Sequence, residues 1–278
     1  MADLEFRRDL YRGTARDYDR FRVPYPQSLI DDLAARSGAN GQGRLLDLAC
    51  GTGQVTFALA GRFVEVWAID QEQDMTSLVA QKARAAGLGH LHVMTSSAED
   101  LSAPDGGFDL VTIGNAFHRL PRTGVAASAL RWLRPGGFLA LLYSGENPWL
   151  GGAPWQRAMA TVVDHWMTRS GGYGRIPAGY EQDRRERPDR TVLADAGFQV
   201  LGDRVFPTEH AWTVETLTGL LFSTAVLSRG ALAGHAGDLA ADLRRELGGF
   251  ESAGGLPETI GFVYELARRP AQVDFVQR

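Results

Sequence analysis

One short segment constrains the fold of this chain more than any other, the glycine turn CGTG at residues 50–53. It follows the apolar run RLLDLA at 44–49 and precedes a stretch at 54–60 that has the pattern of a helix. Glycines at a strand-to-helix turn let a ligand approach the backbone, while the helix N-terminus offers free N–H groups. The segment therefore predicts an α/β protein with a nucleotide-type cofactor site.

Strands and helices alternate through the first half of the chain. Further strands are expected at 64–69, 91–95, 108–113 and 138–143, with helices at 73–86 and 123–133, the latter stopping at Pro135-Gly136-Gly137. Apolar strands separated by helices imply right-handed crossovers and a parallel sheet covered on both faces. With strands at 198–206 and 259–266 and helices at 214–227 and 238–247, the pattern predicts a Rossmann-like, doubly wound, mostly parallel seven-stranded sheet.

The alternation is interrupted after the fifth strand. Residues 146–188 are rich in Gly, Pro, Trp and Arg, which predicts a helical, aromatic cap inserted into one domain rather than an independent second domain. The expected parts are an N-terminal cover at 1–40, a cofactor-binding core at 41–144, the cap insertion at 145–190, and C-terminal strands and helices at 191–278.

Composition narrows the classes of function. The formal net charge is −4, with no run rich in Lys or Arg, which disfavours a protein that binds nucleic-acid phosphates. No apolar stretch approaches the roughly 20 residues that cross a bilayer, and the first residues lack a signal-peptide core. We therefore expect a cytoplasmic protein, without membrane or nucleic-acid partners, that acts on small molecules as a monomer or homodimer. Cys50 is the single cysteine, and we expect no metal site.

The turn excludes two familiar nucleotide sites. A dinucleotide fingerprint needs a third glycine where this chain has Thr56, which also opposes a nicotinamide oxidoreductase, and no Gly-Lys-Ser/Thr follows for a Walker P-loop. Asp47, in the strand before the turn, would repel a diphosphate but would suit a cationic amino group.

Five segments in this order and spacing resemble the motifs of class I S-adenosylmethionine-dependent methyltransferases, over about residues 10–143. They are LLDLACGTGQVTFALA at 45–60, Asp70 at the end of the second strand, SSAEDL at 96–101, FDLVTIGNAFH at 108–118 and LRPGGFLAL at 133–141. The segments at 18–33, 115–118 and 212–229 further resemble the trans-aconitate-methyltransferase-like (methyltransferase type 11) group.

The resemblance implies which residues bind S-adenosylmethionine. Asp70 would accept both ribose hydroxyls, Asp47 would lie near the aminoacyl end, and Asn115 would present its backbone near the methionine portion. A plain helix N-cap is the alternative for Asp70, and a solvated loop acid is the alternative for Glu99. The complete set of expected cofactor-binding residues is Asp47, Ala49, Gly51, Gly53, Asp70, Gln71, Met75, Ala98, Glu99 and Asn115.

His118 is the candidate catalytic residue, because it follows the fourth strand at the carboxyl edge of the sheet, where open α/β folds bind ligands. It could take a proton from the nucleophile, or it could only pack against the ligands. In the resembled group Trp commonly follows this position, whereas here it is Arg119. The other expected substrate contacts are Tyr18, Arg22 and Tyr25 on the N-terminal cover, and Trp149, Trp166 and Tyr173 in the cap. The mixed-charge run DRRERPDR at 183–190 is expected to be a solvated loop; the alternative is a carboxylate-binding cluster, because the founding substrate of the resembled group is a tricarboxylate.

These features predict methyl transfer to an O or N nucleophile of a small molecule, plausibly a specialised-metabolite intermediate, with S-adenosylhomocysteine as product. The alternative is a protein of the same fold that keeps the cofactor but catalyses a rearrangement, cyclisation or decarboxylation without transferring a methyl group.

Overall fold

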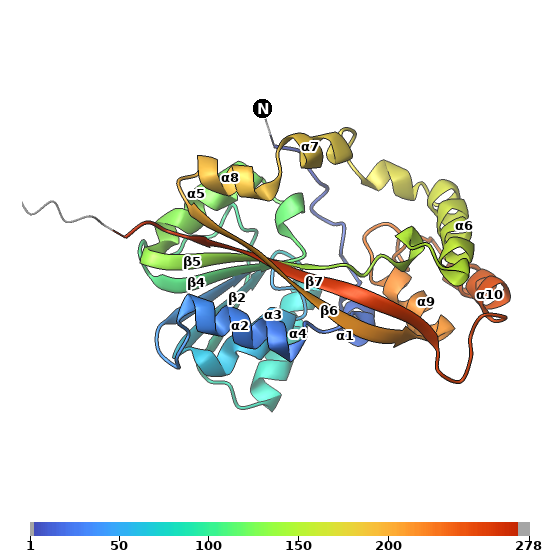
Figure 1. Ribbon diagram of the computed structural model, residues 1–278, viewed down its shortest axis with the longest axis horizontal. Helices are drawn as coiled ribbons and strands as arrows, with labels where there is room; N and C mark the ends of the chain where they lie inside the picture. Colours follow the sequence, from blue (N-terminus) through green and yellow to red (C-terminus); the bar gives the residue numbers. More distant parts are fainter. Residues whose placement is uncertain (1–2, 272–278) are drawn as a thin grey trace, which may run out of the picture.

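The computed structural model describes residues 3–271. Its centre is one seven-stranded sheet with the order β3-β2-β1-β4-β5-β7-β6, in which β7 runs antiparallel to both of its neighbours (Figure 1). This confirms the expected α/β class with a mostly parallel sheet. The strands are β1 (Arg44–Leu48), β2 (Glu65–Asp70), β3 (Leu91–Thr95), β4 (Phe108–Gly114), β5 (Leu133–Ser144), β6 (Gln199–Trp212) and β7 (Leu256–Arg268).

Helices cover both faces of the parallel part of the sheet, and for this reason the central strands are apolar on both sides. One face packs against α2 (Gln27–Ser37), α3 (Gln54–Leu59) and α4 (Gln73–Ala85). The other packs against α5 (Arg122–Trp132) and α8 (Asp189–Asp195), so that the sheet separates two hydrophobic cores (Figure 1).

The cap forms a lobe at the far end of β6 and β7 (Figure 1). Helix α6 (Pro154–Arg169) packs there with α10 (Ala236–Leu247), and α9 (Val214–Phe222) packs against both α10 and the N-terminal helix α1 (Ala15–Phe21). Residues beyond the expected insertion at 145–190 therefore contribute to this lobe. The connection between α6 and α8 contains the short helix α7 (Tyr180–Glu186), and short 3₁₀ turns lie at Ala60–Arg62, Phe117–Arg119, Pro148–Leu150 and Gly172–Arg175.

The structure corrects the bounds of three strands and one helix. Strand β6, expected at 198–206, continues to Trp212, and strand β7, expected at 259–266, runs from Leu256 to Arg268. Strand β5 begins at Leu133 and continues through the Pro-Gly-Gly segment, which the sequence had predicted to be a turn before the strand. The extension pairs with the chain just after β7, since Gly136 N–H donates to Arg269 O at 3.0 Å and Arg269 N–H donates to Gly137 O at 2.8 Å. The helix expected at 214–227 ends at Phe222.

Candidate functional site

The glycine turn between β1 and α3 adopts the backbone geometry that its sequence predicts. Ala49, Gly51 and Gly53 have positive φ values of 51°, 54° and 85°, and Gly53 is the N-cap of α3. A Cβ atom on Gly53 would lie 2.7 Å from the Phe57 ring. Gly53 does not line a cavity, so its contribution is to the shape of the turn, whereas Ala49 and Gly51 line the cavity beside it.

This first cavity, hereafter the cofactor cavity, lies at the carboxyl ends of β1, β2 and β4, where the chain also reverses its strand order. Asp70 at the end of β2 lies in its wall and accepts hydrogen bonds from Gly51 N–H at 2.8 Å and Glu72 N–H at 2.9 Å. Burial raises the pKa of Asp70 above its ordinary value. The cavity brings together most of the expected cofactor residues, namely Ala49, Gly51, Asp70, Gln71, Met75, Ala98, Glu99 and Asn115.

Asp47 faces a smaller recess next to the cofactor cavity, together with Tyr25, Ala49 and Gly51. Its carboxylate accepts hydrogen bonds from the hydroxyls of Thr56 and Thr112. Burial raises its pKa to about 6, although these two hydrogen bonds act in the opposite direction. The Tyr25 hydroxyl is buried and has no hydrogen-bond partner among the described residues. A buried carboxylate and an unpaired hydroxyl in one recess can receive a polar, cationic group of a ligand.

The N-terminal cover crosses the mouth of the cofactor cavity. Phe6, Leu10 and Tyr11 line it, and sequence reasoning missed all three because they belong to no regular element. The segment is anchored to the sheet side by Gly13 N–H, which donates to the Asp74 carboxylate at 3.0 Å, and by Gln71, whose side-chain amide donates to Arg8 O at 3.0 Å.

A second, larger cavity of about 720 Å³, hereafter the substrate cavity, meets the cofactor cavity, and the two share wall residues that include Tyr18, Asn115 and Arg119. His118 lines the substrate cavity, as its position after β4 predicts. Burial and repulsion from Arg119, Arg184 and Arg122 hold the pKa of the His118 imidazole well below its ordinary value. The ring is therefore neutral at pH 7, and its protonated form is strongly disfavoured.

Tyr18 and Arg22 lie on one side of α1, as their spacing predicts, and both line the substrate cavity. Arg22 lies 4.9 Å from the Tyr18 ring, donates to Ser223 Oγ at 2.8 Å and forms an ion pair with Glu146 at 3.4 Å. Sequence reasoning missed Glu146, which is 2% exposed. Its position just after β5, at the ligand-binding edge of the sheet, is the signal that could have found it.

The remaining expected substrate contacts separate into two groups. Trp149 and Tyr173 line the substrate cavity, as does Arg119. Tyr25 lines the recess beside Asp47 instead, and Trp166 lies inside the cap, where its indole N–H donates to Asp242 at 2.9 Å and the side chain is 1% exposed. Trp166 is therefore a packing residue of α6 in this structure.

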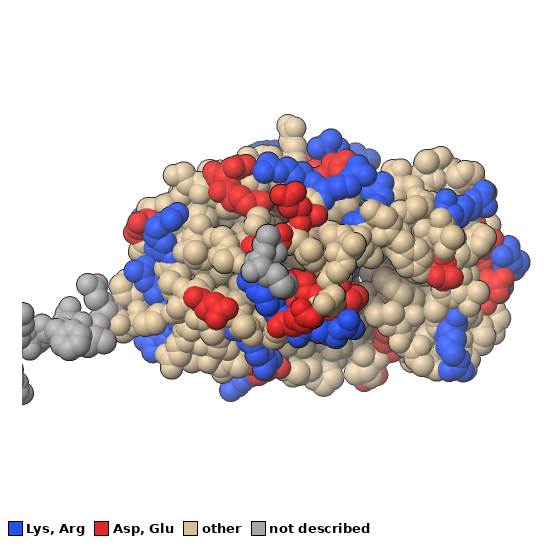
Figure 2. All heavy atoms as spheres, turned by 90° about the horizontal axis from the view of Figure 1, so that it is seen from above, with Lys and Arg blue, Asp and Glu red and all other residues tan. Residues whose placement is uncertain are grey.

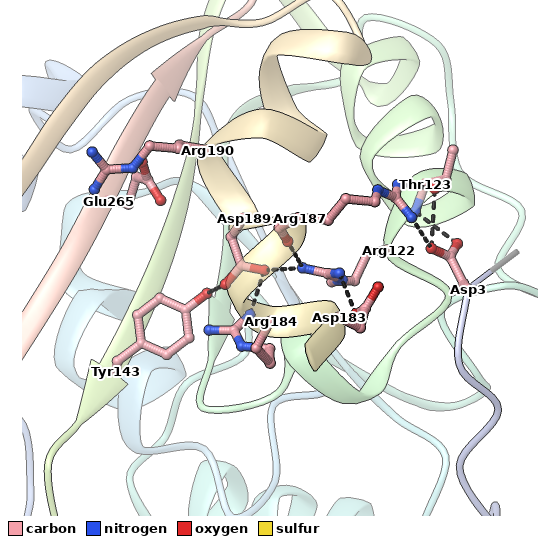
Figure 3. A network of polar contacts seen from close by, with 10 residues as sticks. All are labelled: Asp3, Arg122, Thr123, Tyr143, Asp183, Arg184, Arg187, Asp189, Arg190 and Glu265. Atoms are coloured by element: carbon pink, nitrogen blue, oxygen red, sulfur yellow. Dashed lines mark hydrogen bonds and ion pairs between the residues drawn. The ribbon is translucent and has the colours of Figure 1, made fainter. Parts of the chain in front are cut away.

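The mixed-charge run at 183–190 is not a solvated loop, contrary to the expectation from its sequence. Asp183 and Asp189 are buried, and Arg122 of α5 donates to them at 2.6 and 2.8 Å (Figure 3). Asp189 also accepts hydrogen bonds from Arg184 at 2.5 Å and from the Tyr143 hydroxyl. The network joins α7 and α8 to the sheet and to α5, and it places Tyr143 and Arg184 in the wall of the substrate cavity.

Two further features bear on the classes of ligand. On the face seen in Figure 2, basic and acidic side chains are interspersed, so that this face has no broad basic surface among the described residues. Within residues 3–271 there is no helix long and apolar enough to span a bilayer, and no cluster of His, Cys, Asp or Glu that could hold a metal ion.

The family is defined by comparison with known proteins. The family model described as a methyltransferase domain matches residues 45–137. A ubiquinone/menaquinone biosynthesis C-methyltransferase of Erwinia tasmaniensis is 31% identical over 176 residues, which cover 59% of this chain and 69% of that protein. With the fold and the arrangement of cavities described above, these matches show that the chain belongs to the class I S-adenosylmethionine-dependent methyltransferases.

Other relatives match a shorter part. A Mycobacterium tuberculosis protein described as an uncharacterized methyltransferase is 30% identical over 146 residues, 52% of this chain and 55% of the relative. A demethylmenaquinone methyltransferase of Geobacillus kaustophilus is 32% identical over 120 residues, 42% of this chain and 51% of the relative. The chain thus spans about half the length of these two relatives. The narrower trans-aconitate-methyltransferase-like grouping stays a prediction.

Solved structures share the fold. A protein of Anaeromyxobacter dehalogenans assigned as a type II methyltransferase has a TM-score of 0.62 at 19% identity, covering 91% of this chain and 100% of that chain. The [4+2]-cyclase SpnF has a TM-score of 0.51 at 22% identity, covering 91% of this chain and 84% of that chain. At these identities the likeness concerns architecture alone.

Proposed function

We propose that this protein binds S-adenosylmethionine in the cofactor cavity and transfers its methyl group to an O or N atom of a small molecule held in the substrate cavity. The observation that carries this proposal is the junction of the two cavities at Asn115 and Arg119. A methyl donor on one side and an acceptor on the other would meet there, as an in-line displacement requires.

The described residues fit the parts of the cofactor. Asp70 keeps free lone pairs beside its two backbone hydrogen bonds, and its place in the cavity wall suits the ribose hydroxyls. Met75 and Ala98 offer apolar surface for the adenine, with Gln71 and Glu99 at its edge. Asp47 and the unpaired Tyr25 hydroxyl suit the ammonium and carboxylate of the aminoacyl end.

When bound, S-adenosylmethionine supplies an activated methyl group and its own leaving group, so the chain has mainly to position the acceptor and exclude water. Phe6, Leu10 and Tyr11 of the N-terminal cover line both cavities and exclude water from their junction. His118 lies in the wall as a neutral imidazole, which can accept a hydrogen bond from a hydroxyl or amine acceptor and orient it.

The test is to incubate the full chain with S-adenosylmethionine carrying a deuterated methyl group and with a small-molecule fraction of cell extract. We expect at least one small molecule to acquire the labelled methyl group as S-adenosylhomocysteine accumulates. Binding of S-adenosylmethionine without its consumption, while a small molecule is isomerised or decarboxylated, would support the non-methylating alternative. Calorimetry that detects no binding of S-adenosylmethionine or S-adenosylhomocysteine would refute the cofactor assignment.

A further inference from the structure

The substrate cavity has a cationic wall next to its junction with the cofactor cavity. Arg119 lines both cavities, and Arg184 lines the substrate cavity close enough to His118 to lower the pKa of its imidazole together with Arg119. Tyr143 contributes to the same wall. These side chains come from separate elements, the 3₁₀ turn after β4, α7 and the end of β5.

Both arginines have unused hydrogen-bond donors. Among residues 3–271 no carboxylate lies within ion-pair distance of Arg119, whose contacts are the Tyr11 ring at 4.9 Å and Asn115 O at 3.4 Å. Arg184 directs one nitrogen to Asp189, which holds the guanidinium in place (Figure 3). A guanidinium has five N–H donors, so each side chain retains a fork that matches a carboxylate or a similar oxyanion.

Asp189, which does not line the cavity, forms an ion pair with Arg184 at 2.5 Å, whereas the described acidic side chains that line the cavity pair with neither Arg119 nor Arg184. Glu146 is buried in its ion pair with Arg22, while Asp164 and Glu181 are exposed. Exposed carboxylates belong to the mouth of the cavity, where water screens them. The less exposed part of the cavity, around Arg119 and Arg184, therefore favours an anion.

Another part of the wall is apolar. Ala160, Val163 and Met167 line it from α6, and Leu221 lines it from α9. The apolar surface continues to the mouth, where Leu150 is 77% exposed and Ile176 is 39% exposed. Large apolar side chains exposed at the rim of a cavity are typical of a site for an apolar ligand.

We propose that the substrate is a hydrophobic molecule with one acidic group, whose anion is bound by Arg119 and Arg184 while its apolar body lies against α6 and α9 and reaches the mouth at Leu150. This inference rests on the proposed function, because it assigns the larger cavity to the substrate. Asp189 is a positioning residue in this site, since it fixes Arg184 and Tyr143 without lining the cavity itself.

The inference can be tested by calorimetry with decanoate as the probe and decanamide as its uncharged match, both in the presence of saturating S-adenosylhomocysteine. We expect decanoate to bind at least about tenfold more tightly than decanamide, because charge-assisted hydrogen bonds to arginine are lost with the amide. In the series hexanoate, octanoate and decanoate, affinity should rise roughly fourfold for each added methylene as the apolar wall is covered.

Substitutions test whether the preference for decanoate over decanamide comes from the cationic wall. Arg119→Gln and Arg184→Gln should each remove most of the preference for acid over amide while leaving decanamide affinity within about twofold of the original. Arg119→Gln breaks no ion pair of the described residues, so it keeps the test valid if Arg184→Gln disturbs the fold. The matched control is Arg190→Gln on α8, because Arg190 points toward Glu265 (Figure 3) and does not line the substrate cavity.

Equal affinities for decanoate and decanamide would overturn the inference, as would a failure of decanoate to bind when S-adenosylhomocysteine binds. An Arg119→Gln protein that binds acid and amide equally more weakly than the original would also overturn it. If S-adenosylhomocysteine itself does not bind, the proposed function fails instead, so the two failures are distinguished in the same calorimetric series.

Discussion

Replacing Asp47 with Asn is expected to remove a loss of stability that grows with pH in the free protein, and to weaken cofactor binding. The side chain is 1% exposed, and burial raises its pKa from 3.8 to about 6. A raised pKa means that the folded state binds the proton more tightly than the unfolded state does. The stability contributed by Asp47 is therefore complete below pH 3.8 and is lost as the pH rises through 6.

The magnitude follows from these two values. Relative to the fully protonated group, titration of Asp47 lowers the free energy of unfolding by about 2 kcal/mol at pH 5 and by about 3 kcal/mol at pH 8. Asn does not titrate, but its hydrogen bonds with Thr56 and Thr112 are weaker than those of the carboxylate. The difference in free energy of unfolding between the two proteins at one pH therefore contains both the lost titration and the weaker hydrogen bonds. The change in that difference with pH isolates the titration, and it should be about 1 kcal/mol in favour of the variant from pH 5 to pH 8.

Urea unfolding of both proteins at pH 5 and pH 8 measures this quantity. Asp105→Asn is the control, because Asp105 is 70% exposed in a surface ion pair and should show a difference near zero at both pH values. In parallel, Asp47→Asn should weaken S-adenosylhomocysteine binding at pH 8 by roughly tenfold, since an ionised partner for the ligand ammonium is lost. A difference in stability that is constant with pH would refute the reasoning about buried Asp47.

Three other substitutions test the site and its supporting network. Asp70→Asn should weaken S-adenosylhomocysteine binding in calorimetry by about 2 kcal/mol, roughly thirtyfold, because charged hydrogen bonds to the ribose are lost; unchanged affinity would remove Asp70 from the ribose site. His118→Gln should lower turnover by roughly 10² or more if the imidazole accepts the proton of a hydroxyl or amine, and by less than tenfold if it only orients the acceptor. Arg122→Gln should lower the free energy of unfolding by about 3 kcal/mol or more in urea, because Asp183 and Asp189 lose a buried partner; a loss below about 1 kcal/mol would contradict a buried role for the network.

The parallel half of the fold could be predicted from the sequence because its signals are local. Strands β1, β2 and β4 are short apolar runs that are largely buried, and the glycine turn at Gly51 and Gly53 fixes where β1 ends. The true length of β5 could not be predicted, since its start depends on pairing with residues near Arg269. The same holds for β6 and β7, which extend beyond the core because they pair with each other over most of their length.

The cofactor-binding residues follow the ends of strands, and the ends of strands can be predicted from the sequence. The substrate residues depend on contacts between distant segments, which no periodicity encodes. The burial of Asp183 is an example, because its partner Arg122 lies 61 residues away. A run of alternating charges is solvated unless a distant partner buries it. No sequence signal near 183–190 indicates that such a partner exists. Trp166 shows the converse, since an aromatic residue in the cap finds its partner Asp242 within the lobe rather than in the cavity.

In the proposed assignment, carboxylates lie near the cofactor and guanidinium groups lie near the substrate. Asp47 and Asp70 lie at the cofactor end, Arg184 lies on the substrate side, and Arg119 lies in the wall that the two cavities share. This arrangement of charges favours binding of a cationic methyl donor and an anionic methyl acceptor, and it orients each of them. Where an oxyanion accepts the methyl group, the new C–O bond replaces the C–S bond, and both the positive charge on sulfur and the negative charge on oxygen disappear. The neutral product then loses its attraction to the arginines, so the charges that bind the substrate do not retain the product. An acceptor that is already ionised needs no base, which agrees with an imidazole at His118 whose protonated form is disfavoured by the same arginines.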